Sequence, residues 1–77
     1  MRESAHRTAA ENVIAGLTAC RGLDYQGLSD LLTSLSRREL AMAATAALAS
    51  LAAVIDHNLG GDPGMEYVKH NLRRICQ

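Results

Sequence analysis

Residues 40–55 read LAMAATAALASLAAVI, and only Thr45 and Ser50 interrupt this apolar run. Alanine fills half of it, and alanine has the highest intrinsic helix propensity, followed closely by leucine and methionine. A helix built from this run is apolar around nearly its whole circumference, so other helices must cover it. We therefore expect the rest of the chain to be organised around one central helix.

The two ends of this helix carry recognisable borders. Ser36 and Glu39 have the spacing of a capping box, in which each side chain binds a backbone N–H group at the helix start. Gly60 and Gly61 follow the apolar run, and glycine just beyond the last turn commonly ends a helix. These borders predict a single helix over about residues 37–59.

Side chains of different size fall on different faces of this helix. The larger aliphatic side chains, together with two alanines, share a broad face that we expect to form the core of the protomer: Leu40, Ala44, Ala47, Leu48, Leu51, Val54, Ile55 and Leu59. The opposite face carries a stripe of smaller residues: Met42, Ala46, Ala49 and Ala53. Two interpretations of this stripe are open. It is exposed to solvent, or a second helix from this chain or from another copy approaches it closely.

Three shorter amphipathic helices flank the central one. They are expected from residue 3 or 4 to residue 20, over about residues 25–35, and over about residues 64–75. Asp24 is the predicted N-cap of the second helix, and Asp62, followed by Pro63, is that of the last. Because strand patterns are nearly absent, we predict an all-α fold: one four-helix domain over residues 1–77, orthogonal or bundle-like.

The composition leaves little material for a core. Among the 77 residues there is no Phe and no Trp, so leucine, isoleucine, valine, methionine and alanine must fill the interior. Chains of this length are only marginally stabilised by one core, and many gain stability by assembling. We therefore expect a homodimer whose subunit contact, or a tight helix crossing, involves Met42, Ala46, Ala49 and Ala53.

The charges balance at eight basic against eight acidic residues, which argues against a dedicated nucleic-acid binder. A candidate basic patch nevertheless exists near helix ends: Lys69, His70, Arg73, Arg74, Arg37 and Arg38. The segment LTSLSRREL also resembles the helix boundary of bacterial helix-turn-helix regulators, although a recognition helix is short and polar on its outer face. A nucleic-acid-binding regulator is thus one alternative, and solvated arginines are the other interpretation.

No stretch carries a recognisable catalytic or metal-binding chemistry. His6, His57 and His70 lie on different predicted elements, and neither Cys20 nor Cys76 belongs to a CxxC motif. The Gly-rich segment after the long helix lacks the lysine and the preceding strand of a phosphate loop. We predict no enzyme, no metal and no cofactor.

The first residues have no apolar region of the kind found in signal peptides, so we expect a cytoplasmic protein with reduced thiols. The run over residues 40–55 is shorter than the roughly 20 apolar residues of a membrane span. A membrane-bound state is therefore not favoured. A small membrane-active toxin remains a further alternative.

Residues 27–55 combine a leading helix, the segment LSRREL and an Ala-rich helix. This pattern resembles small Ala- and Arg-rich helical accessory proteins of actinobacteria and their phages. The resemblance implies a compact regulatory or accessory protein that acts by binding, and it assigns no functional residues. The expected function is therefore that of a non-enzymatic protein–protein interaction protein.

Overall fold

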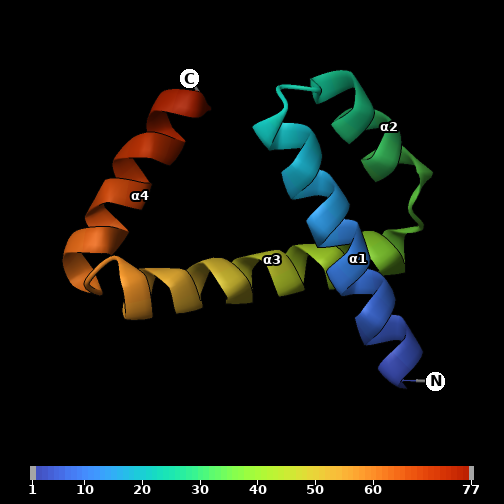
Figure 1. Cartoon of the computed structure of the whole chain (residues 1–77), viewed down its shortest axis with the longest axis horizontal. Coiled ribbons are helices and arrows are strands. Elements are labelled where there is room, and N and C mark those ends of the chain that lie inside the picture. Colours follow the sequence, from blue (N-terminus) through green and yellow to red (C-terminus); the bar gives the residue numbers. More distant parts are fainter. Residues whose placement is uncertain (1, 77) are drawn as a thin grey trace. The chain divides into compact units, whose positions relative to one another are not determined.

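The computed structural model describes residues 2–76, with side chains from residue 8 onward. This part of the chain forms four helices and no strand (Figure 1). The helices are α1 (Arg2–Arg21), α2 (Tyr25–Ser34), α3 (Arg37–Asn58) and α4 (Asp62–Ile75). The prediction of an all-α, four-helix fold is confirmed. The chain divides into an N-terminal unit, Met1–Ala47, and a C-terminal unit, Leu48–Gln77. The single domain over residues 1–77 stays a prediction.

In the N-terminal unit, α1 and α2 pack side by side in opposite directions (Figure 1). Leu23 ends α1 in a left-handed conformation, with φ of 57°. The N–H of Leu23 donates to the carbonyl of Cys20 at 3.1 Å, and that of Asp24 donates to Ala19 at 2.8 Å. This is a Schellman motif, which satisfies carbonyls at the helix end. The Asp24 side chain then accepts the N–H of Gly27 at 2.8 Å, so the predicted N-cap is confirmed.

Hydrogen bonds from two side chains stabilise the link between α2 and α3. The N–H of Ser36 donates to Glu39 Oε1 at 2.9 Å, and the N–H of Glu39 donates to Ser36 Oγ at 3.1 Å. These reciprocal bonds confirm the predicted capping box. The helix that follows, α3, is continuous over its 22 residues, as the sequence predicted.

In the C-terminal unit, glycines make the turn from α3 to α4. Gly60 and Gly61 have φ of 84° and 72°, and the Gly61 N–H donates to the carbonyl of Ile55 at 2.9 Å. The prediction that Asp62 is the N-cap of α4 was wrong. Gly61 takes that position without a side-chain hydrogen bond, because the turn needs a backbone conformation that glycine adopts readily, and α4 already begins at Asp62.

The broad apolar face of α3 forms the core of the described chain only in part. Of its members only Ile55 is buried, at 6% exposure, while the large side chains of Leu40, Leu48, Leu51, Val54 and Leu59 are exposed. In the N-terminal unit the buried residue of α3 is Ala43 instead, with 7% exposure. The predicted core face is therefore confirmed only in part: Ile55 is buried and Leu40, Ala44 and Ala47 face the α1–α2 pair, but the large side chains of this face stay exposed.

Candidate functional surfaces

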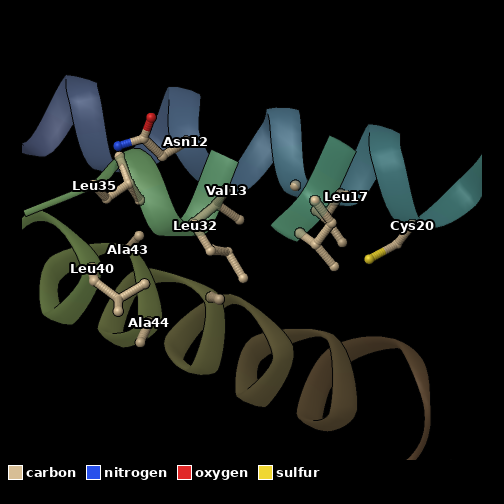
Figure 2. A pocket seen from close by; sticks show the side chains of 12 residues that line it. Asn12, Val13, Leu17, Cys20, Leu32, Leu35, Leu40, Ala43 and Ala44 are labelled. Atoms are coloured by element: carbon tan, nitrogen blue, oxygen red, sulfur yellow. The ribbon is translucent and has the colours of Figure 1, made fainter. Parts of the chain in front are cut away.

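An apolar groove of about 320 Å³ lies in the N-terminal unit, between the α1–α2 pair and the first turns of α3. Figure 2 shows leucine side chains of α1 and α2 directed toward α3 across this space. Its lining includes Val13, Leu17, Leu32, Leu35 and Leu40. The groove is open, because the side chains of Leu17, Leu32 and Leu40 remain exposed. The sequence predicts that other helices cover α3, and it gives no sign of this opening.

Two polar side chains mark positions along this groove (Figure 2). Among the described side chains, the Nδ2 of Asn12 is buried without a hydrogen-bond partner, and such an atom costs about 1–3 kcal/mol. Protein atoms shield it from solvent, so a ligand in the groove does not reach it. Cys20, farther along α1, is a half-buried free thiol.

The predicted contact stripe on α3 has two differently covered halves. Met42 and Ala46, in the N-terminal unit, are half-buried within the chain. Ala49 and Ala53, in the C-terminal unit, are exposed. The second half is therefore free to receive another helix, and the subunit contact at these residues stays a prediction.

The six residues of the candidate basic patch fall into two groups. Arg37 and Arg38 are exposed at the start of α3 in the N-terminal unit. The group on α4, in the C-terminal unit, consists of Lys69, His70, Arg73 and Arg74. Neither unit therefore contains the whole predicted patch.

Within the α4 group, two of the cations are engaged along the helix itself. Lys69 Nζ pairs with Glu66 Oε2 at 2.8 Å, and Arg74 Nη2 donates to Asn71 Oδ1 at 3.2 Å. Such exposed pairs contribute little to stability, so their side chains can exchange partners easily.

The exposed apolar residues of α4 adjoin this basic group. Met65, Leu72 and Ile75 are exposed, and they share one face of the helix with the half-buried Val68. The spacing of these four residues by three and four places them on one side of the helix. It gives no sign that most of that side is left uncovered.

Metal-ligating chemistry finds no support in the described part of the chain. Its histidine, cysteine and acidic residues form no group of three that could hold a metal ion. The two cysteines are free thiols, and Cys76 is exposed.

The comparisons with known proteins give no relative: no family model, curated protein or solved structure matches the chain.

Within the described residues, α3 alone is long and apolar enough to cross a membrane, and 11% of its most apolar stretch is buried. The surfaces of the molecule must therefore be interpreted from their own chemistry.

Proposed function

We propose that the chain is a non-enzymatic interaction protein, regulatory or accessory, that forms a homodimer and binds another protein. The observation that supports this proposal is the small amount of apolar material that each unit buries. Among the described residues, the N-terminal unit buries only Ala9 and Ala43, and the C-terminal unit only Ile55 and Gly64. A chain that hides so few side chains from water gains stability by covering more of them with a partner.

The exposed side chains are sufficient to drive such an assembly. Fourteen large apolar side chains of the described residues are exposed. Full burial of one such side chain contributes about 1.5–3 kcal/mol, whereas association costs about 4–15 kcal/mol in lost freedom. A contact that covers about half of the fourteen would offset that cost.

The stripe of small residues on α3 is the proposed centre of the contact. Alanine side chains allow two helix backbones to approach closely, which increases the number of atoms in contact. Ala49 and Ala53 are exposed in the single chain and are thus free for this role. Met42 and Ala46 continue the stripe into the N-terminal unit, where they are half-buried.

Sedimentation velocity over a wide range of concentrations tests the proposal. The unmodified chain should sediment as a dimer, and Ala49→Arg should convert it to a monomer with unchanged far-UV circular dichroism. Because Ala49 is exposed, an arginine there does not disturb the packing of the single chain. Asn58→Arg is the matched control, since Asn58 is also exposed but projects about 180° away from Ala49 around the helix.

The outcomes test separately whether a dimer forms and where on α3 its contact lies. A monomer at every concentration contradicts the proposed assembly. A dimer that persists in Ala49→Arg, but dissociates when Leu51 is replaced by arginine, keeps the assembly and moves the contact to the exposed leucine side of α3.

A further inference from the structure

The helix α4 has the most pronounced amphipathic character of the four helices, with a low overall hydrophobicity. Met65 and Leu72 are seven residues apart and therefore lie on the same side of the helix. Their side chains are 43% and 49% exposed, and Ile75 in the last turn is 67% exposed. The C-terminal unit thus leaves a strip of apolar surface open along α4.

Positive charge borders this strip. At 100° per residue, Lys69 and Arg73 project from the same edge of the apolar face, 40° and 80° from Met65. The acidic residues of α4, Asp62 and Glu66, both lie in its first half, and no acidic residue follows Glu66 in the chain. The second half of α4 therefore combines exposed apolar side chains with an excess of cations, although Lys69 also pairs with Glu66 at 2.8 Å.

We propose that α4 docks on an anionic lipid surface. Its apolar face enters the boundary between headgroups and acyl chains, while Lys69 and Arg73 contact the headgroup phosphates. A large amphipathic moment, low overall hydrophobicity and basic residues beside the apolar face are the characteristics of helices that lie in a membrane interface. An anionic lipid surface attracts the cations and covers the exposed apolar strip at the same time.

A nucleic acid fits the same residues less well. A duplex backbone would attract the cations of α4 but would leave Met65, Leu72 and Ile75 in water. An anionic bilayer removes those side chains from water and offers a negative surface potential to the cations.

The binding mode is interfacial rather than spanning. The helix α4, with its 14 residues, is about 21 Å long at 1.5 Å per residue. That is shorter than the hydrocarbon core of a bilayer, which is about 30 Å thick. An interfacial helix binds reversibly and with a dependence on salt, and these two properties can be measured directly.

Vesicle flotation with the full chain tests the proposal. The protein should float with vesicles of phosphatidylcholine and phosphatidylglycerol, should bind vesicles of phosphatidylcholine alone far more weakly, and should be released by high salt. The double variant Lys69→Gln, Arg73→Gln should bind at least about tenfold more weakly. The matched control is Arg37→Gln, Arg38→Gln, which removes two charges from the N-terminal unit and should bind as before.

The apolar contribution is tested with a second matched pair. Leu72→Ser should weaken binding by about tenfold, whereas Leu23→Ser should not, although Leu23 is 72% exposed. Far-UV circular dichroism checks that the helices persist. Should Leu72→Ser lose helicity, Ile75→Ser at the end of α4 takes its place, with the same expectation.

Several results would overturn the proposal. An equal loss of binding in both charge variants would show a general attraction of the whole chain. Equal, salt-resistant binding to neutral vesicles would indicate insertion of α3 instead. Unchanged vesicle binding in Leu72→Ser, with loss of the dimer or of affinity for duplex DNA, would assign the strip on α4 to a second copy or to nucleic acid.

Discussion

The turn between α1 and α2 and the turn between α3 and α4 both contain a left-handed backbone conformation, but different types of residue adopt it. Each turn requires a left-handed backbone conformation. In the second turn Gly60 and Gly61 adopt it, with φ of 84° and 72°. In the first turn Leu23 adopts it, with φ of 57°, although Gly22 stands next to it. A glycine in the sequence therefore marks a turn without identifying the residue that carries the unusual conformation.

The two turns also differ in what compensates their cost. A left-handed conformation costs a non-glycine residue about 1–2 kcal/mol. At Leu23 this cost is offset by the Schellman hydrogen bonds and by Asp24, whose N–H closes α1 while its carboxylate caps α2. The second turn has no such cost, and Gly64, in the first turn of α4, permits a close approach to Leu59. This difference leads to predictions of decreasing size.

The largest effect is expected at Gly64, where the second turn packs most closely. A Cβ atom there would lie 2.6 Å from both the Cβ and the carbonyl oxygen of Leu59. Gly64→Ala should therefore destabilise the C-terminal unit by about 1–3 kcal/mol, even though alanine favours helix. Urea unfolding followed by circular dichroism measures the effect, and hydrogen exchange should place it in residues 48–76.

Gly16→Ala is the control for that substitution. Its new Cβ would lie 3.5 Å from Leu28 Cδ1, an ordinary contact. Because Gly16 lies within α1, alanine there should stabilise the protein by about 0.5–1 kcal/mol. Similar destabilisation in both variants would show that the close approach at Leu59 is not the cause.

A smaller loss is expected at Gly60, where only the backbone conformation matters. No atom lies within 4 Å of the position that a Cβ would take. Gly60→Ala should cost about 1–2 kcal/mol through its positive φ alone. Gly22→Ala, whose φ is not in the left-handed range and whose nearest new contact is 3.5 Å away, should change the unfolding free energy little. Thermal or urea unfolding of the two variants distinguishes them.

At Leu23 the substitution should stabilise the protein instead of destabilising it. Leu23→Gly relieves the left-handed strain of about 1–2 kcal/mol but increases the freedom of the unfolded chain, which takes back about 0.4–1 kcal/mol. The variant should thus be more stable by about 0.5–1 kcal/mol in the same unfolding measurement. A loss of stability would mean that the 72% exposed Leu23 side chain makes contacts that outweigh the strain.

The borders of the helices could be predicted from the sequence because they depend on local residues. Asp24 and the Ser36–Glu39 pair act on N–H groups within three residues of themselves. How completely α3 is covered could not be predicted, because helical periodicity gives the angle of each side chain but not how closely another helix approaches it. Ala43 is buried and the leucines are exposed for that non-local reason.

The candidate surfaces also combine features that local residues determine with features that depend on non-local packing. The amphipathic pattern of α4 was evident from its sequence, since each side chain's position on the helix depends only on spacing. The exposure of Met65 and Leu72 depends on how far the end of α3 covers α4, and the groove beside Leu17 depends on how loosely α3 meets the α1–α2 pair. Neither of these quantities is encoded in a local motif.

The link between α2 and α3, which contains no glycine, should show the smallest effect, and it should depend on pH. The backbone N–H and then the hydroxyl of Ser36 bind the Glu39 carboxylate and lower its pKa below the usual 4.5. Since the pKa is lower in the folded state than in the unfolded state, the cap contributes stability above the unfolded pKa. That contribution is lost as the pH falls through the folded pKa. Glu39→Gln should remove this part of the acid-induced loss of helicity, whereas Glu11→Gln, at an exposed position in α1, should retain it. Identical acid titrations of both variants by far-UV circular dichroism would show that the capping carboxylate does not stabilise the start of α3.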